Sequence, residues 1–297
     1  TGQSLDAELG SPAFNAWART NVYRQRQPGY AVATVSLPLG DLSGWQLRRL
    51  ASVARRFVGD TVRTTVEQNI VLRWVRESDL PALHGELESI GLARPGAGSI
   101  ADITACPGTD TCKLGIASSR GLAAELERRL GEQMDTLDEQ VKQLRIKISG
   151  CFNSCGQHHV ADIGFYGVSR TVNGFKVPHF QVVLGGQWEE NAGSYGLPVV
   201  AIPSKRIPDA LERITEFYMR QREAEEPFAK FVKRVGKVKI RAVLDDLTQN
   251  LPEPETNPDF YADWADPRQY SLGDIGKGEC AGEVVTQYEF QMTSAER

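Results

Sequence analysis

Four cysteines fall in two close pairs, and their thiols are the side chains in this 297-residue sequence best suited to chemistry. Five residues separate Cys106 from Cys112, and three separate Cys151 from Cys155, with a glycine on either side of the second pair. A cuboidal iron–sulfur cluster needs four thiolates from loops that fold around it, and small residues let the backbone come close. The pattern therefore predicts a cluster site and, with it, electron transfer.

Other uses of the four cysteines stay open on spacing alone. Structural zinc sites usually space each pair by two to four residues, which Cys151 and Cys155 fit but Cys106 and Cys112 do not. Disulfides need an oxidising compartment, and the chain lacks a small, cysteine-dense framework. Buried or free thiols are the remaining alternative. A fifth cysteine, Cys280 in GKGECAGE, lies far along the chain, and we expect a free thiol or a packing residue there.

The sequence around the cysteines resembles a known family. The segments DITACPGTDTCKLGIASSRGLA and IKISGCFNSCGQHHVADIGFYG, followed by VVLGG, are similar to the siroheme and [4Fe-4S] hemoproteins that reduce sulfite or nitrite. Upstream, GYAVATVSLPLGDL and TVRTTVEQNIVLRWV resemble the ferredoxin-like half-domain of that family, and the resemblance extends to about Gly236. It implies the C-terminal half of an oxidoreductase that reduces sulfite to sulfide or nitrite to ammonia in six one-electron steps. An iron–sulfur electron-transfer module without its own reductase activity is the alternative.

The resemblance also implies roles for single residues. In the family one cysteine binds both the cluster and the siroheme iron, and by position this is Cys155. The segment TVRTTVEQNI lies near siroheme in the family, which makes Arg63, Gln68 and Asn69 candidate partners for its acidic groups. Lys113 directly follows a ligand and could counter the negative charge of the cluster or of siroheme.

Three more side chains near the second cysteine pair belong to this interpretation. Asn153 lies between two ligands and could donate a hydrogen bond to a cluster sulfur. We expect local hydrogen bonding for His158 and His159, because the shared cysteine already fills the axial position on the haem iron. Phe152 stands where sulfite-reducing relatives often have proline, so the substrate stays open between sulfite and nitrite.

Partners follow from the same resemblance. We expect the N-terminal half of the reductase to supply most of the basic residues that bind the substrate anion, so no catalytic residue is assigned in this chain. The electron donor is expected to be ferredoxin or an NADPH-dependent flavoprotein. The sequence does not begin with Met, and TGQSLDAELG is no signal peptide, so we expect a fragment or a processed product.

Composition limits the remaining possibilities. Hydrophobic residues make up 41% of the chain and the net charge is −4, with both signs interspersed, so nothing suggests nucleic acid or an anionic membrane surface. No apolar run approaches the length of a membrane span. Cysteines assigned mainly to a cluster fit a reducing cytoplasm.

Hydrophobic periodicity predicts an α+β fold, and the resemblance implies a ferredoxin-like half-domain followed by a mixed α/β domain that binds siroheme and [4Fe-4S]. We expect a linker or arm over 1–27, the half-domain over 28–95, the cluster domain over 96–250 and an extended tail over 251–297. In the half-domain, strand-like and helical patterns alternate at 30–37, 43–58, 62–75 and 79–90. In the cluster domain, a helix is expected from the first cysteine loop to Gly131, with its positive N-terminal end toward the cluster.

Overall fold

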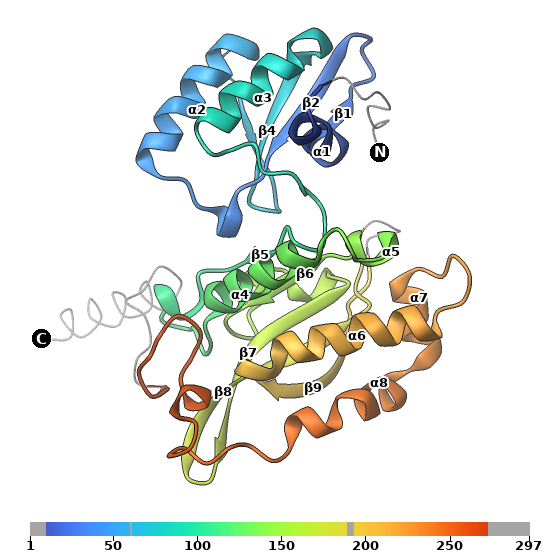
Figure 1. The fold of residues 1–297 in the computed structure, drawn as a ribbon. Helices are drawn as coiled ribbons and strands as arrows, with labels where there is room; N and C mark the ends of the chain where they lie inside the picture. Colours follow the sequence, from blue (N-terminus) through green and yellow to red (C-terminus); the bar gives the residue numbers. More distant parts are fainter. Residues whose placement is uncertain (1–9, 60, 189–192, 273–297) are drawn as a thin grey trace, which may run out of the picture. The chain divides into compact units, whose positions relative to one another are not determined.

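The computed structural model describes residues 10–59, 61–188 and 193–272. The chain forms two compact units, the first made of Thr1–Thr104 with Leu137–Gln143 and the second of Ala105–Thr136 with Leu144–Arg297. Each unit combines helices with a sheet, so the fold is α+β as the sequence predicts (Figure 1).

The first unit contains a four-stranded antiparallel sheet with the strand order β1-β2-β4-β3. Helix α2 contacts both strand β4 and helix α3, and buried aliphatic residues of these elements form the core of the unit (Figure 1). Its elements are α1 (Pro12–Asn21), β1 (Val22–Arg24), β2 (Tyr30–Val35), α2 (Gly44–Phe57), β3 (Arg63–Thr64), β4 (Ile70–Arg76), α3 (Leu80–Ser89) and α5 (Glu139–Lys142).

Helix α2 begins where its sequence predicts. The hydroxyl of Ser43 accepts a hydrogen bond from the backbone N–H of Gln46 at 3.1 Å, and the Gln46 side chain accepts one from the backbone N–H of Ser43 at 3.1 Å. This reciprocal pair satisfies two of the donors that a helix start leaves free. Leu50 and Val53 on the same helix are buried in the core.

The stretch that forms α1 corrects the expectation of an arm over 1–27. Ser11 caps the helix by accepting the N–H of Phe14 at 3.2 Å, and Pro12 occupies the first turn. Trp17 has no exposed surface, and its ring centre lies 5.2 Å from that of His84. Two large buried aromatic residues make α1 part of the core, so the arm prediction is wrong for these residues.

The second unit contains a five-stranded sheet with the order β5-β6-β7-β8-β9, in which β6 and β7 are parallel and β7, β8 and β9 run antiparallel. Helix α4 continues to Gln133, past the glycine that was predicted to end it. Its elements are β5 (Thr104–Ala105), α4 (Ser119–Gln133), β6 (Ile146–Ser149), β7 (Ile163–Val172), β8 (Phe175–Leu184), β9 (Leu197–Pro203), α6 (Ile207–Gln221), α7 (Phe228–Val235) and α8 (Lys237–Leu244).

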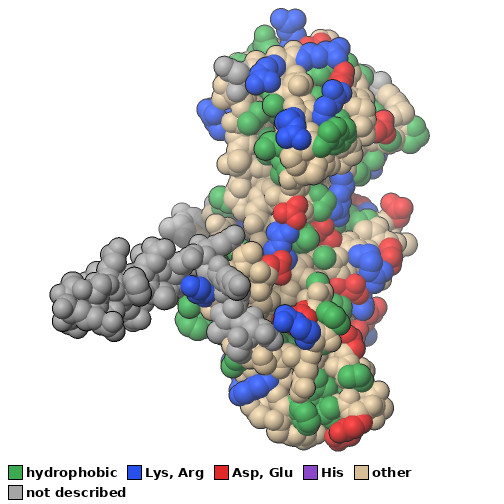
Figure 2. Space-filling view, turned by 90° about the vertical axis from the view of Figure 1, so that its left-hand side faces the viewer, with side chains coloured by type: hydrophobic (Ala, Val, Ile, Leu, Met, Phe, Trp, Pro, Cys, Tyr) green, Lys and Arg blue, Asp and Glu red, His purple; other side chains and the backbone are tan. Residues whose placement is uncertain are grey.

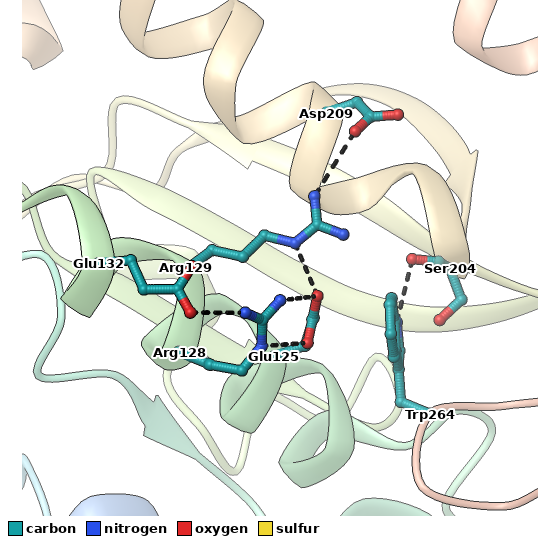
Figure 3. A network of polar contacts seen from close by, with 7 residues as sticks. All are labelled: Glu125, Arg128, Arg129, Glu132, Ser204, Asp209 and Trp264. Carbon is teal, nitrogen blue, oxygen red and sulfur yellow. Dashed lines mark hydrogen bonds and ion pairs between the residues drawn. The ribbon is translucent and has the colours of Figure 1, made fainter.

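Ion pairs connect helix α4 to helix α6 on the surface of this unit. The guanidinium of Arg129 lies 2.6 Å from Glu125 on α4 and 3.8 Å from Asp209 on α6 (Figure 3). Arg128 pairs with Glu125 at 3.0 Å and with Glu132 at 2.8 Å. Exposed pairs of this kind contribute about 0–1 kcal/mol each, so they add little to the stability of the unit.

The prediction of an extended tail over 251–297 is wrong for the part that is described. A short 3-10 helix, Pro258–Tyr261, packs its buried aromatic rings on the second unit. The indole N–H of Trp264 donates to the carbonyl of Ser204 at 3.1 Å (Figure 3), and the hydroxyl of Tyr270 donates at 2.6 Å to a carbonyl in the loop of the first cysteine pair. The segment therefore holds that loop through a hydrogen bond to its backbone.

Charged side chains of both signs are interspersed over the visible surface of the second unit, whereas Lys and Arg predominate on the visible face of the first (Figure 2). Within the described residues, no helix has both the length and the apolar character needed to cross a membrane. Cys280 lies outside the described residues.

Candidate metal centre

Two loops at neighbouring strands carry the four cysteines. Cys106 directly follows β5 and Cys112 ends the same loop, while Cys151 and Cys155 follow β6. Strands β5 and β6 are adjacent in the sheet, and the loops that follow them line the same cavity. The backbone N–H of Cys106 donates to the carbonyl of Ile148 at 3.1 Å, which continues this pairing into the first loop. The sheet therefore brings together pairs that lie about 40 residues apart in sequence.

The four thiols surround one cavity of about 200 Å³. Three of the cysteines are buried, and the fourth, Cys155, is exposed. The cavity is lined by Cys106, Pro107, Gly108, Cys112, Leu114, Gly115, Ser149, Gly150, Cys151, Asn153 and Cys155. Four thiols around a space of this size, with small residues between them, fit a cuboidal cluster.

Glycines allow the two loops to pack directly on each other. A methyl group on Gly150 would lie 2.5 Å from Cα of Gly108 and 2.9 Å from the carbonyl oxygen of Ala117. One on Gly115 would lie 2.8 Å from the backbone of Gly108, and one on Gly156 would lie 2.1 Å from the carbonyl oxygen of Ile148. Real side chains do not approach backbone atoms this closely, so residues larger than glycine would force the loops apart.

Backbone N–H groups of the loops bind sulfur and carbonyl acceptors at the cavity. The N–H of Gly150 donates to Sγ of Cys106 at 3.1 Å, and its carbonyl accepts from the N–H groups of Ile116 and Ala117 at 2.8 and 3.0 Å. The hydroxyl of Ser119 donates to the Cys106 carbonyl at 2.7 Å and lies 3.5 Å from Sγ of the same residue. Such bonds hold a thiolate in place and stabilise its negative charge.

The thiols affect one another's ionisation. Burial raises the pKa of Cys151, the charges of the other three cysteines raise it further, and the backbone N–H of Asn153 lowers it. The pKa of Cys155 is also raised, first by exclusion of water and then by Cys106 and Cys112. The raised pKa values favour the protonated forms of Cys151 and Cys155 in the absence of a metal, and coordination deprotonates a thiol outright.

The arrangement argues against the zinc alternative. In the part of the chain that the structure describes, no group of three or more His, Cys, Asp or Glu side chains is placed to hold a single metal ion. The cysteines line the walls of a cavity instead of converging on one point, as a tetrahedral zinc site requires.

The N-terminal end of α4 has a partner that was not predicted. Its cap residue, Ser118, accepts the N–H of Gly121 at 3.2 Å and gives its own N–H to the carboxylate of Asp263 at 2.7 Å. Burial raises the pKa of Asp263 to about 6, while the N–H groups of Trp264 and Ser118 lower it. The positive helix end therefore faces a buried carboxylate from the C-terminal segment. Ser119, the first residue of α4, also contacts Cys106, so the expectation that this end faces the cluster stays a prediction.

The other predicted site residues are distributed over both units. Asn153 lines the cavity, and Lys113 is half-buried next to Cys112. Arg63 and Gln68 belong to the first unit, where Arg63 is exposed on β3 and Gln68 occupies a turn with a φ of 66°. Their role toward siroheme stays a prediction.

Asn69 serves the first unit itself. Its amide oxygen accepts the N–H of Leu37 at 2.8 Å, and its amide nitrogen donates to both carboxylate oxygens of Asp102 at 2.9 and 3.1 Å. The residue is 3% exposed, so its side chain is used within the fold and is not available to a cofactor.

Sequence reasoning missed Ser149, which lines the cavity from the end of β6. The one feature of the sequence that could have indicated Ser149 is its position two residues before the ligand Cys151. The expectation for His158 is confirmed, because its Nδ1 lies 2.8 Å from the hydroxyl of Ser149.

The fold and the cavity together define an iron–sulfur cluster domain that follows a ferredoxin-like unit. Residues 96–251 match the nitrite and sulphite reductase 4Fe-4S domain, and residues 23–90 match the nitrite/sulfite reductase ferredoxin-like half domain. The chain belongs to the nitrite and sulfite reductase family.

Relatives with either substrate in their names are similar to this chain. A sulfite reductase (ferredoxin) from Mycobacterium tuberculosis is 33% identical over 250 residues, which is 82% of this chain and 43% of that protein. A ferredoxin–nitrite reductase from Synechococcus elongatus is 27% identical over 207 residues, which is 69% of this chain and 40% of that protein. The chain thus spans less than half the length of these relatives.

Two solved structures have a similar fold. The Mycobacterium tuberculosis NirA protein has a TM-score of 0.66 at 29% identity, over 75% of this chain and 41% of that one. Dissimilatory sulfite reductase I has a TM-score of 0.61 over 91% of this chain and 82% of that one, and at 13% identity it is similar in fold alone.

Proposed function

We propose that this chain is the cluster-bearing half of a reductase that converts sulfite to sulfide or nitrite to ammonia at siroheme bridged to a [4Fe-4S] cluster. Cys106, Cys112, Cys151 and Cys155 hold the cluster. The single observation that carries the proposal is the cavity that these four thiols enclose, in a chain that belongs to the nitrite and sulfite reductase family.

The surroundings of Cys155 support a haem on its side of the cavity. Cys155 is the one exposed cysteine of the four, and exposed apolar side chains lie near it in sequence and at the cavity wall: Phe152 is 66% exposed and Leu114 is 42% exposed. A flat macrocycle buries apolar surface against such side chains. Siroheme, when bound, supplies the iron at which the substrate is reduced, while the protein orients it and tunes its electronic properties.

This chain's own residues have three tasks in the proposal. The two loops fix the thiolates, the N–H of Gly150 and the backbone N–H of Asn153 stabilise sulfur charge, and the surrounding core excludes water from three of the sulfurs. Arg63, Gln68 and Lys113 are candidate partners for the acidic groups of siroheme.

The remaining components come from other proteins or segments. The chain spans about 43% of the sulfite reductase it resembles, so we propose that a second half supplies the rest of the substrate pocket. Ferredoxin or an NADPH-dependent flavoprotein is the proposed electron donor, and the reducing cytoplasm is the proposed location. Sulfite and nitrite are both retained, because relatives of either kind are similar to this chain.

Anaerobic reconstitution with iron and sulfide, followed by siroheme, tests the proposal by visible spectroscopy. We expect cluster absorption first, and haem bands coupled to the cluster once the other half of the reductase and siroheme are present. The assay for turnover uses reduced methyl viologen with sulfite or nitrite. Replacing Cys155 with Ser is expected to abolish the coupled spectrum. Cluster absorption without haem binding under all these conditions would indicate an electron-transfer module, and a colourless protein would contradict the proposal.

A further inference from the structure

Ser149 is a buried polar residue beside the four cysteines. It is the last residue of β6, it is 1% exposed, and it lines the space between the four cysteines. Its hydroxyl oxygen accepts the N–H of Gly156 at 3.1 Å and lies 2.8 Å from Nδ1 of His158. A serine oxygen can accept two hydrogen bonds and donate one, so the direction of the His158 bond decides where the Ser149 proton points.

The surroundings of His158 settle that direction. Its ring has no exposed surface and packs against the rings of His159 and Tyr166, with centres 4.0 and 4.7 Å away. Burial lowers the pKa of His158 to about 4, so the ring is neutral and carries one proton near neutral pH. Its Nε2 is buried and has no hydrogen-bond partner among the described residues.

Burying an N–H without an acceptor costs more free energy than burying a ring nitrogen that accepts no hydrogen bond. The N–H loses its hydrogen bond to water and gains no other. The favoured form of His158 therefore carries its proton on Nδ1 and leaves Nε2 bare. In this form Nδ1–H donates to Ser149. The Ser149 oxygen then accepts from both Gly156 and His158, and its own O–H remains available to another acceptor.

We propose that the hydroxyl of Ser149 donates a hydrogen bond to a sulfur of the cluster, and that His158 is the positioning residue that directs it there. The inference rests on the proposed cluster but not on siroheme or on the substrate. A donor to a cluster sulfur stabilises the added negative charge of the reduced cluster and raises its reduction potential. Ser149 thus sets the potential at which the cluster accepts an electron.

The test is an anaerobic redox titration of the reconstituted 297-residue chain, with iron and sulfide content measured on each sample. Ser149→Ala removes the donor, and losing one hydrogen bond to a charged group should disfavour the reduced cluster about tenfold, which corresponds to about 59 mV for one electron. Ser204→Ala is the matched control, because Ser204 is a buried serine of the same unit that does not line the cavity. We expect it to leave the potential unchanged.

Two variants of His158 separate positioning from packing. His158→Asn keeps an N–H donor at the place of Nδ1, whereas His158→Phe keeps the ring against Tyr166 but has no donor. We expect the Asn variant to keep a potential near that of the wild type and the Phe variant to lower it. Adding His158→Phe to Ser149→Ala should change nothing further, since the hydroxyl that His158 directs is already absent.

Equal potentials in Ser149→Ala and Ser204→Ala, at equal iron and sulfide content, would overturn the proposal. So would a lowered potential in His158→Asn with none in His158→Phe, because packing and not the donor would then matter. If Ser149→Ala does not bind a cluster, the reduction potentials of the two His158 variants decide whether the proposal holds. Failure of the wild-type chain to bind iron and sulfide would instead refute the proposed function.

Discussion

Replacing Gly150 with Ala should disrupt the metal centre from a position that contributes no ligand. The added methyl group would lie 2.5 Å from Cα of Gly108 and 2.9 Å from the Ala117 carbonyl oxygen, and both are backbone atoms that cannot rotate away. The loop must move. Movement weakens the two hydrogen bonds to the Gly150 carbonyl from Ile116 and Ala117, and the bond from the Gly150 N–H to Sγ of Cys106.

The expected size follows from these contacts. Overpacking of a buried position costs about 1–3 kcal/mol, and the two carbonyl hydrogen bonds contribute about 1 kcal/mol each. The free energy of unfolding of the apo chain should therefore fall by about 3–5 kcal/mol in Gly150→Ala. Urea denaturation followed by circular dichroism measures this change, and iron and sulfide analysis after reconstitution shows whether the cluster still assembles.

Gly131→Ala is the matched control. Gly131 lies in α4 of the same unit, and a methyl group there would meet no atom within 4 Å. Because alanine favours a helix over glycine, this variant should be more stable than the wild type by about 0.5–1 kcal/mol. If Gly150→Ala and wild type had equal stability and equal cluster content, the close approach of the two loops would not be needed for the site, and the reasoning would be refuted.

Further outcomes follow from the same structure. Replacing Cys106, Cys112 or Cys151 with Ser should prevent cluster assembly, because a hydroxyl is a poor ligand for iron; iron and sulfide at wild-type levels in all three would contradict this. Burial raises the pKa of Asp263 from 3.8 to about 6, so the folded state holds this proton more tightly than the unfolded state. The contribution of Asp263 to the free energy of unfolding is therefore complete below about pH 4. It decreases by about 3 kcal/mol as the pH rises past about 6. Urea denaturation of the wild type and of Asp263→Asn, at the low and the high pH, measures this decrease. An equal change in the free energy of unfolding of both proteins between these pH values would contradict it. Ser43→Ala removes the capping box of α2 and should lower the stability of the first unit by about 1 kcal/mol; unchanged urea denaturation would show that the cap is dispensable.

Local sequence signals were enough to locate the cluster loops. Thiols and glycines at close spacing predict a buried inorganic site because few other structures need both, and the structure places all four cysteines around one cavity. Helix α2 could also be predicted, because Ser43, Gln46 and the buried face of the helix lie within one continuous segment. The start of α2 depends on residues close in sequence, whereas each cysteine pair was visible locally and only the sheet brings the two pairs together.

Contacts between distant residues could not be predicted in this way. The described tail looks polar and rich in proline, yet Tyr270 and Asp263 bind backbone groups of the first cysteine loop and of the start of α4, about 145–154 residues earlier. The role of Asn69 depends on Asp102, which periodicity does not connect to it. For α1 the signal was present, since Ser11 and Pro12 form a typical helix start, but the polar residues around Trp17 obscured it.

Mössbauer spectroscopy of the chain, reconstituted anaerobically with iron and sulfide, tests the central claim most directly, because it identifies the iron species that the four cysteines hold. The account predicts the signal of a [4Fe-4S] cluster in the wild type and its loss in Cys106→Ser. A mononuclear iron signal, or a protein that binds zinc in preference to iron and sulfide, would contradict it.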